Sequence, residues 1–411
     1  MKAKIIKILE RITKSFARLT LWRYRPIIIG ITGSVGKTSA KMAISAVLGD
    51  FNRVRFSANN FNNELGVPLT ILSDVSEIKG KLFWIKVLFK SLWRIIHRAP
   101  YPEVLVLEYG IDRPGDMKYL LSIGRPTIAV MTEIGQVPPH VEFFESTQGL
   151  VREKNRIIEQ LPVGGYAILN HDCDLIMDMK ERTRGHVVTY GFNKEADVRL
   201  SAYDLRMENG QPIGITFKLE YGGSIVPVRL DNVFGKTHCY AAGAAAAVGI
   251  SLGMNSVKIS EALMKNYEPP KHRLQLLPGI KDTLILDDAY NASPSSMRAG
   301  LETLHELPAK RKVAVLGDML EIGEFAMSAH EEVGRMANKV ANLLITIGPR
   351  AKFIAESAKN AGFMKKNIWS FDTADEAKAT VQKYIKKGDL ILVKGSRAMQ
   401  LEIIIEEIKA F

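Results

Sequence analysis

The residues with the clearest chemical potential are the glycines, lysine and threonine of the stretch GITGSVGKTSAKMA, residues 30–43. They follow the apolar run PIIIG and precede a stretch of helical periodicity, so the sequence predicts a strand, a glycine-rich turn and a helix. In such a turn backbone N–H groups converge on an anion, and the helix N-terminus adds partial positive charge. Gly33 and Gly36 allow close approach and positive φ. Lys37 can reach β- and γ-phosphates, and the Thr38 hydroxyl can bind Mg²⁺.

This turn departs from the strict phosphate-loop pattern G-x-x-x-x-G-K-[ST], because Ile31 occupies the position of the first glycine. The alternative is a glycine-rich strand–helix turn with a solvated lysine. Strand, loop, lysine and threonine nevertheless all occur in the context that a phosphate loop requires. The motif therefore predicts binding of a nucleoside triphosphate and names no reaction. The residues assigned here to binding of the nucleoside triphosphate are Thr32, Gly33, Ser34, Val35, Gly36, Lys37, Thr38 and Ser39.

From residue 26 onward, apolar β-branched runs alternate with stretches of helical periodicity, which is typical of α/β folds with parallel sheets. The sequence pattern changes at about 196–230. There, apolar and polar residues alternate and turn residues are frequent, which predicts a few antiparallel strands. The stretch NYEPPKHR, with two prolines and no periodicity, indicates a linker. We therefore expect an α/β fold in which a P-loop central domain, 26–268, combines a parallel sheet with a small antiparallel portion. A Rossmann-like C-terminal domain, 269–411, follows.

The composition, 46% hydrophobic and 24% charged over 411 residues, is that of a soluble globular protein with two or three domains. Cys173 and Cys239 are the two cysteines, which give no disulfide framework or metal cluster and fit a reducing cytosol. The basic charge is localised: residues 1–25 carry +7 and residues 79–98 carry +6, so within a total of +12 the remainder carries −1. This distribution excludes a diffuse nucleic-acid-binding surface, and we expect no nucleic-acid partner.

Both basic segments are predicted to be amphipathic helices. Residues 1–25 do not resemble a secretory signal, because charges interrupt the apolar residues every three or four positions. Residues 79–98, an insertion in the central domain, contain Trp and Phe and no acid, which suits a helix in the headgroup plane of an anionic leaflet. The protein would then be cytoplasmic and peripheral on the inner face of the cell membrane. Alternatively, both helices pack on the protein and show their lysines to water; the sequence favours neither interpretation.

Six stretches occur in an order that resembles the Mur ligase family, most closely its MurF-type branch. They are TGSVGKTS, NNFNNELGVPLTIL, VLEYGIDRPGDM, DDAYNASPSSMRAGLETL, VLGDMLEIGEFAMSAH and VKGSRAMQLE, and the resemblance covers about residues 26–411. It implies an ATP- and Mg²⁺-dependent amide ligase that adds D-alanyl-D-alanine or a similar amine to a cell-wall muramoyl peptide. In that chemistry the γ-phosphoryl group activates a carboxylate as an acyl phosphate, and the amine displaces phosphate.

The resemblance also implies a catalytic and metal-binding set. Glu108 ends the strand EVLVLE, where an acid faces the ligand crevice of a parallel sheet, and would share Mg²⁺ with Thr38. His140 matches a ligand of a second Mg²⁺, although Glu133 and a preceding proline pair depart from the usual pattern. Lys154 matches a lysine that is carbamylated in relatives and then binds metal. Each residue has a structural alternative. Glu108 could make only a surface or cap contact at the strand end, His140 could be a solvated loop residue, and Lys154 could be an exposed helix lysine. The catalytic residues implied are Lys37, Glu108, His140 and Lys154, and the metal ligands Thr38, Glu108, His140 and Lys154.

Further residues are assigned to nucleotide and substrate by the same resemblance. Relatives usually carry asparagines where this chain has Cys239 and Ala242, so adenine recognition is expected to differ. Turn chemistry and ordinary surface roles are the alternatives for the whole group. The additional nucleotide-binding residues implied are His238, Arg273, Asp288 and Asn291. The substrate-binding residues implied are Asn60, Asn63, Asp318, Glu321, Lys394, Ser396 and Arg397.

The family normally carries a domain before the phosphate loop that grips uridine diphosphate, whereas only 25 residues precede PIIIGITG. We expect the acyl substrate to be recognised through its peptide, through a partner protein or as a lipid-linked precursor. Two other functions stay open: a superfamily amide ligase for a non-muramoyl acceptor, and a membrane-associated ATP-binding scaffold without ligase activity. A P-loop motor or kinase is disfavoured, because the C-terminal stretches would then have no role.

Overall fold

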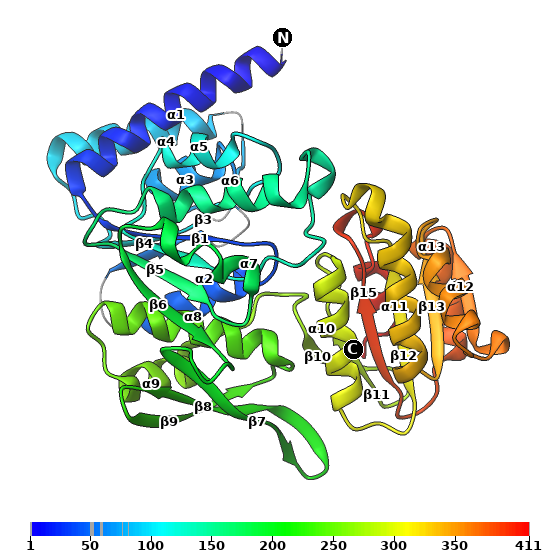
Figure 1. Cartoon of the computed structure of the whole chain (residues 1–411). Helices are drawn as coiled ribbons and strands as arrows, with labels where there is room; N and C mark the ends of the chain where they lie inside the picture. Colours follow the sequence, from blue (N-terminus) through cyan, green and yellow to red (C-terminus); the bar gives the residue numbers. More distant parts are fainter. Residues whose placement is uncertain (1, 50–52, 58–60, 76, 81, 411) are drawn as a thin grey trace.

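A computed structural model describes the chain except residues 1, 50–52, 58–60, 76, 81 and 411 (Figure 1). In the described residues, one sheet has the strand order β2-β3-β1-β4-β5-β6-β7-β8-β9. The pairs from β2 to β7 in this order are parallel. The pairs β7–β8 and β8–β9 are antiparallel, as predicted for about 196–230. The strands are β1 Ile27–Thr32, β2 Val54–Phe56, β3 Val104–Glu108, β4 Ile128–Met131, β5 Tyr166–Asn170, β6 His186–Gly191, β7 Val198–Glu208, β8 Gln211–Tyr221 and β9 Ser224–Asp231.

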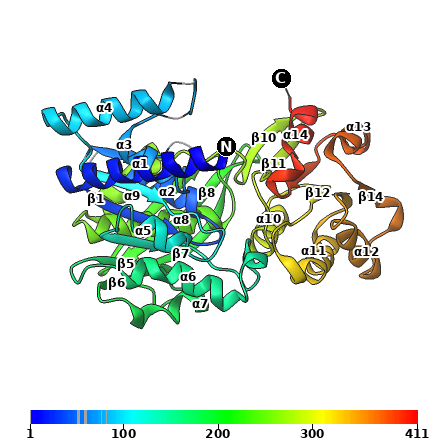
Figure 2. The same cartoon turned by 90° about the horizontal axis from the view of Figure 1, so that it is seen from above.

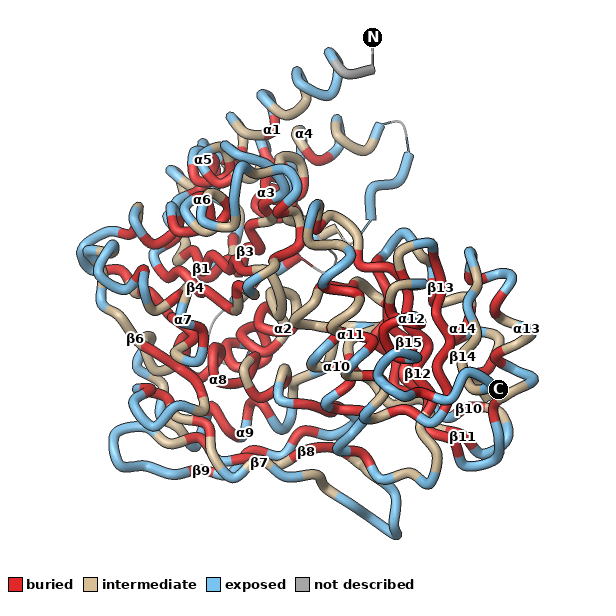
Figure 3. The backbone as a smooth tube through the Cα atoms, turned by 45° about the vertical axis from the view of Figure 1, so that its right-hand side comes forward, coloured by how far each residue is buried: buried red, intermediate tan, exposed pale blue. Residues whose placement is uncertain are grey.

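Helices cover both faces of this sheet because its central strands are apolar on both sides. Along β1, Ile29 and Ile31 join the core beneath α2 and α8, whereas Ile28 joins the core beneath α1, α3 and α5. Figure 3 shows buried residues along the strands of both sheets. The helices of this region are α1 Lys2–Tyr24, α2 Lys37–Leu48, α3 Gly66–Leu72, α4 Phe83–His97, α5 Asp116–Leu121, α6 Thr147–Glu159, α7 Asp174–Met177, α8 Lys236–Ser251 and α9 Ser256–Asn266, with short 3₁₀ turns Val141–Phe143 and Lys180–Arg182.

The predicted basic helices are present as α1 and α4, side by side on one face of the central region (Figures 1 and 2). Their C-terminal ends are joined by Tyr24, whose hydroxyl donates to the carbonyl oxygens of Arg94 and Ala99 at 2.7 and 2.9 Å. The Tyr24 ring also stacks on Tyr101, with ring centroids 4.5 Å apart. The two segments, far apart in sequence, therefore form one surface.

A second sheet lies beyond the connection from α9 to β10, which contains the predicted boundary near residue 268. In the described residues its order is β10-β11-β15-β12-β13-β14, parallel except for the pair β10–β11. This agrees with the expected Rossmann-like arrangement. Its strands are β10 Gln275–Gly279, β11 Thr283–Asp287, β12 Lys312–Gly317, β13 Leu343–Ile347, β14 Ile368–Phe371 and β15 Leu390–Lys394. Its helices are α10 Pro294–Glu306, α11 Ala326–Val340, α12 Lys352–Asn360, α13 Ala374–Tyr384 and α14 Glu402–Ile408, with 3₁₀ turns Gly323–Phe325, Lys365–Asn367 and Arg397–Met399.

Candidate active site

The phosphate loop connects β1 to α2 and is fastened to the end of β4. Gly33 and Gly36 have φ of 145° and 85°, a region that residues with a Cβ rarely adopt. A Cβ on Gly33 would lie 2.1 Å from the hydroxyl oxygen of Thr132, and this hydroxyl donates to the carbonyl oxygen of Val35 at 2.6 Å. Both the backbone conformation and the close approach of β4 therefore require glycine at position 33.

Replacing Gly33 with alanine should lower the free energy of unfolding by about 2–4 kcal/mol, because the new Cβ must displace Thr132 and the backbone is strained at positive φ. Urea denaturation followed by circular dichroism measures this. Gly164 is the matched control, since a Cβ there meets no atom within 4 Å. Gly164→Ala should change stability by no more than about 0.5 kcal/mol. Equal effects of the two substitutions would contradict the steric account.

Lys37 begins α2 and folds back over the loop, where its Nζ donates to the carbonyl oxygens of Gly33 and Ser34 at 2.9 and 3.3 Å. Burial lowers the pKa of Lys37. Thr32 and Ser39 are both buried: Thr32 donates to a backbone carbonyl at 3.0 Å, and Ser39 bonds to a tyrosine hydroxyl. These two predicted residues support the loop from behind. The loop residues that line the adjoining cavity of about 290 Å³ are Ser34, Val35, Gly36, Lys37 and Thr38.

Glu108 lies at the end of β3, where the sequence places it, and faces the same cavity. Its Oε2 accepts from the Thr38 hydroxyl at 3.3 Å and lies 3.7 Å from Lys41 Nζ, while its Oε1 accepts from Asn62 Nδ2 at 3.2 Å. Within the described residues, no group of three or more His, Cys, Asp or Glu forms a metal cage. Mg²⁺ is typically held by one or two carboxylates, waters and substrate phosphates, so an acid beside a hydroxyl at a phosphate loop fits it.

His140 is held between the two domains by acidic side chains from each of them. Its Nε2 lies 3.4 Å from Asp112 Oδ1, and its Nδ1 lies 2.8 Å from Oε2 of Glu321 in the C-terminal domain. Burial, with Lys37 and Lys154 nearby, lowers the pKa of His140 to about 4, so the ring is neutral at pH 7. A neutral imidazole can donate a lone pair to a metal, and the metal role of His140 stays a prediction.

Lys154 projects from α6 and is only 2% exposed, so it is not the solvated helix lysine of the alternative interpretation. Its Nζ donates to the carbonyl oxygen of Gly33 at 3.1 Å, beneath the phosphate loop. Burial and the charge of Lys37 lower its pKa well below the ordinary value, while Asp112 acts in the opposite direction. Asp112 thus influences both Lys154 and His140, and sequence reasoning did not single it out although it lies within the quoted stretch VLEYGIDRPGDM.

The amide-rich loop before α3 contributes a different residue from those assigned. Asn63 Oδ1 accepts from the Gly66 N–H at 2.9 Å and stabilises the start of α3, whereas Asn62 is the residue that bonds to Glu108. Asn60 lies outside the described residues. The sequence showed several adjacent amides but not which one faces the sheet, because loop conformation decides that.

The opposite wall of the cavity comes from the C-terminal domain. The Arg273 guanidinium lies over the Tyr290 ring at 4.2 Å, and Arg397 lies over the same ring at 5.3 Å. Asn291 Oδ1 accepts from the N–H groups of Ala292 and Arg397 at 2.9 and 3.3 Å. The C-terminal residues that line the cavity with the phosphate loop are Arg273, Tyr290, Asn291, Ala292, Ser293 and Ser296. Two domains therefore enclose one site.

Other assigned C-terminal residues form its buried support. Lys394 Nζ lies 2.5 Å from Asp288 Oδ2 and donates to the Asn291 carbonyl oxygen at 3.0 Å. Asp318 Oδ1 accepts from a backbone N–H at the start of α12 at 2.6 Å, and Ser396 Oγ accepts from the Leu320 N–H at 2.9 Å. Burial raises the pKa of Asp288 and lowers that of Lys394, while the pairing of the two opposes both shifts.

His238 is buried at the start of α8 and holds the connection between the domains. Its pKa is lowered to about 4 by burial. The neutral ring can therefore donate from Nε2 to the Arg273 carbonyl oxygen, 3.1 Å away, and accept at Nδ1 from the Tyr267 hydroxyl, 2.8 Å away. Cys239 and Ala242 are fully buried in the core. This stretch of α8 thus anchors the linker, and the nucleotide contact of His238 stays a prediction.

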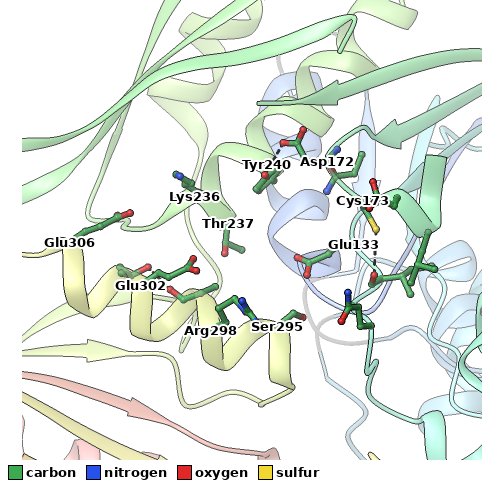
Figure 4. Close-up of a pocket in the computed structure, with 18 residues that line it drawn as sticks. Glu133, Asp172, Cys173, Lys236, Thr237, Tyr240, Ser295, Arg298, Glu302 and Glu306 are labelled. Carbon is green, nitrogen blue, oxygen red and sulfur yellow. Dashed lines mark hydrogen bonds between the residues drawn. The ribbon is translucent and has the colours of Figure 1, made fainter. Parts of the chain in front are cut away.

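A cavity of about 620 Å³ adjoins the phosphate loop and was not predicted (Figure 4). Glu133, Thr237 and Tyr240 line both this cavity and a smaller one that includes the loop residues Val35 and Gly36, so the two spaces are contiguous. Burial raises the pKa of Glu133. On the other side, α10 contributes Ser295, Arg298, Glu302 and Glu306. Room for a nucleoside therefore lies beside the phosphate loop, between the two domains.

Known proteins share this organisation. The Mur ligase middle domain matches residues 92–249, and the Mur ligase, glutamate ligase domain matches residues 272–397. The UDP-N-acetylmuramoyl-tripeptide–D-alanyl-D-alanine ligase of Bacillus subtilis is 31% identical over 384 residues, which are 93% of this chain and 75% of that protein. The corresponding Escherichia coli protein is 27% identical over 402 residues, 96% of this chain and 80% of that protein. The crystal structure of MurF ligase from Thermotoga maritima in complex with ADP is similar with a TM-score of 0.78 and 27% identity, covering 97% of this chain and 83% of that one.

Proposed function

Since the chain belongs to the Mur ligase family, we propose that it joins D-alanyl-D-alanine, or a closely similar amine, to a cell-wall muramoyl peptide. It is an ATP-dependent, ADP-forming ligase of peptidoglycan precursors, and ATP and Mg²⁺ are its cofactors. One observation carries the proposal. The phosphate loop and Glu108 share a cavity with Arg273, Tyr290 and Asn291, so groups from both domains can act on one phosphoryl group.

The first chemical step forms an acyl phosphate. A carboxylate oxygen of the peptide attacks the γ-phosphorus of ATP, and ADP leaves. Lys37, the N-terminus of α2 and Arg273 offset the negative charge of the phosphates. When bound, Mg²⁺ supplies further charge neutralisation, and Thr38 and Glu108 would hold it. Because the cavity lies between two domains, their closure would exclude water that could otherwise hydrolyse the acyl phosphate.

The second step forms the amide. The amine nitrogen attacks the acyl carbon and loses a proton, and phosphate leaves with the former carboxylate oxygen. Glu321 and Arg397 are the partly or fully exposed members of the assigned substrate set at the C-terminal edge. We assign Arg397 to the carboxylate of the incoming dipeptide and Glu321 to the neighbourhood of its amine. Both assignments follow charge complementarity.

Phosphate release measured with ATP, Mg²⁺, a muramoyl tripeptide and a panel of amines tests the function. We expect release that requires both the peptide and the amine, with D-alanyl-D-alanine preferred over L-alanyl-L-alanine. Product identity is checked by mass spectrometry. Activity with other acids but not with muramoyl peptides would indicate a ligase for a non-muramoyl acceptor. Equal rates of ATP consumption with and without the amine would contradict ligation.

We also propose that the ligase works as a peripheral protein at the inner face of the cell membrane. The concentration of positive charge in residues 1–25 and 79–98 supports this location, since anionic lipids attract such segments. None of the helices in the described part of the chain combines the length and the apolar character that a bilayer crossing requires. The proposed association is therefore with the membrane surface.

A further inference from the structure

The outer face of α4 exposes large apolar side chains. The exposed fractions are 64% for Ile85, 71% for Phe89, 51% for Trp93 and 65% for Ile96. Ile85, Phe89 and Trp93 follow one another at intervals of four residues, so they form a stripe along one side of the helix. Full burial of one such side chain contributes about 1.5–3 kcal/mol relative to exposure. A stripe of this size indicates a surface that is covered when the protein functions.

The exposure is a consequence of how α4 packs on the domain. Among its described residues, Val87 and Ser91 are the buried ones, and Phe83, Trp84 and Leu88 are partly buried against the same core. Ser91 Oγ donates to the carbonyl oxygens of Val87 and of Leu72, at 2.7 and 3.3 Å. The helix thus packs one apolar side, which includes Phe83 and Trp84, on the domain and turns a second apolar side, the stripe defined above, outward. Helix α4 therefore packs on the protein, as one interpretation of the sequence expects, and it also exposes large apolar side chains beside its lysines.

Basic side chains flank the stripe. Lys86, Lys90 and Arg98 are exposed on α4, and Lys7 and Arg11 are exposed on the neighbouring α1. Residues 79–98 contain no acid at all, and Glu10 is the single acid of residues 1–25. An apolar stripe bordered by cations complements hydrocarbon beneath a layer of phosphates. An acidic protein partner would complement the lysines but would leave the aromatic stripe without a matching surface.

A cavity of about 690 Å³ continues this surface at the N-terminal end of α4. Leu82, Phe83 and Val87 contribute its apolar lining. The lysines Lys79, Lys86 and Lys90 also border it, and they outnumber the one acid among the described lining residues, Asp74. A space with apolar walls and lysines beside it suits an anionic amphiphile. The cavity and the stripe therefore point to the same class of partner.

We propose that the surface formed by α1 and α4 docks on an anionic lipid bilayer. Ile85, Phe89 and Trp93 lie at the boundary between headgroups and acyl chains, and the lysines contact lipid phosphates. This names the contact residues of the peripheral association proposed above, and it does not depend on the ligase reaction.

The docked surface is also close to the candidate active site. Helix α3 begins beside the loop of Asn62, which bonds to Glu108, and the carbonyl oxygen of Leu72 at its end accepts from Arg94 of α4 at 3.3 Å. Seven residues of α-helix span roughly 10 Å, and the thickness of α4 adds about 10 Å between this point and the exposed stripe. An extended tripeptide reaches about 10 Å, and the sugar and diphosphate of a lipid-linked precursor lengthen that reach. If the proposed function holds, the acyl donor is therefore a lipid-linked muramoyl peptide presented by the same membrane.

Co-sedimentation with vesicles tests the docking surface. The full-length protein should bind vesicles of phosphatidylglycerol and phosphatidylcholine, bind phosphatidylcholine alone far more weakly, and be released by salt. Phe89→Asp should weaken binding about tenfold or more. Ile225→Asp is the matched control, because Ile225 is 59% exposed on β9, and it should bind like the wild type. Lys86→Glu should reduce the preference for the anionic lipid. Absence of wild-type binding, or unchanged binding of Phe89→Asp, would overturn the proposal.

Ligation assays with the same variants separate docking from catalysis. With a nucleotide-linked or free muramoyl peptide in solution, Phe89→Asp should retain wild-type phosphate release. With a lipid-linked donor in vesicles, its rate should fall in proportion to the lost binding. Equal rates of wild type and variant on the lipid-linked donor would overturn the lipid-linked substrate while leaving the docking surface intact. If the wild type showed no activity with any donor, the ligase function would instead be refuted.

Discussion

Substitution of Lys37 by alanine should lower amine-dependent ATP turnover by about 10²–10³-fold, the loss typical when a preorganised donor to developing charge is removed. Lys37 is the cation at the start of α2 and lies over the loop carbonyls of Gly33 and Ser34. A bound triphosphate would replace those weak acceptors with charged oxygens. The phosphate loop would then retain its backbone N–H groups but lose the charge that reaches the transferred phosphoryl group. Phosphate release at saturating substrates measures the effect.

The fold should survive this substitution, which makes the loss of turnover interpretable. Burial already lowers the pKa of Lys37, so the folded state gains little from holding the cation there. Thermal unfolding of Lys37→Ala should therefore match the wild type within a few degrees. Lys258→Ala, at an exposed position on α9, controls for the loss of any lysine and should keep full activity. A variant at position 37 that turns over ATP normally would exclude the loop as the site of phosphoryl transfer.

The sequence was sufficient to predict the position of those site residues that lie at the end of a strand or the start of a helix. The phosphate loop follows a strand and starts a helix, and Glu108 ends a buried strand, so their position follows from sheet topology alone. The antiparallel continuation of the sheet was also predicted from alternation. The strands β2, β6, β10 and β14 were not, because they lack the unbroken apolar, β-branched run that marks the central strands.

The hydrogen-bond partners of side chains that depend on tertiary packing could not be predicted from the sequence. Asp318 and Ser396 follow strand ends as ligand-binding residues do, yet their side chains bond to the backbone N–H groups of Ala351 and Leu320. Asn62 rather than Asn63 reaches Glu108, because the loop conformation turns one amide inward. The nucleoside-sized cavity could not be foreseen either, since it exists only where α10 approaches the central domain. These hydrogen bonds and the cavity depend on how segments distant in the sequence pack together, which the pattern of residues within one segment does not predict.

Substitution of Lys154 by methionine should have opposite effects on activity and stability. Lys154 is buried beside Lys37 and the Gly33 carbonyl oxygen, and its pKa is well below the ordinary value because of burial and the second cation. Methionine fills a similar volume without a charge to desolvate, so we expect a gain of about 1–3 kcal/mol in the free energy of unfolding near neutral pH. Amine-dependent ATP turnover should fall by about 10²-fold or more, since a group beneath the phosphate loop is lost. Such a trade-off is common where function requires an unfavourable charge.

The pH dependence of the stability gain identifies its cause. A lysine whose folded-state pKa is depressed binds fewer protons folded than unfolded, so wild-type stability rises with pH between the folded pKa and the ordinary value of 10.5. The advantage of Lys154→Met should therefore be largest at acidic pH and shrink as the pH approaches 10.5. Urea denaturation across this range measures the difference. A gain that is independent of pH would show that packing, not charge, explains it.

The chemical state of Lys154 in solution decides which catalytic role is lost in the methionine variant. A depressed pKa leaves part of the lysine as a neutral amine, and a neutral amine can add carbon dioxide to form a carbamate and release a proton. Carbon-13 NMR with labelled bicarbonate should therefore give a carbamate signal in the wild type that is absent in Lys154→Met. With this signal, the residue would present oxygens to a metal, as its resemblance to the family implies. If turnover falls but the wild type gives no signal, Lys154 acts as a cation or amine at the phosphates, and its assignment as a metal ligand is wrong.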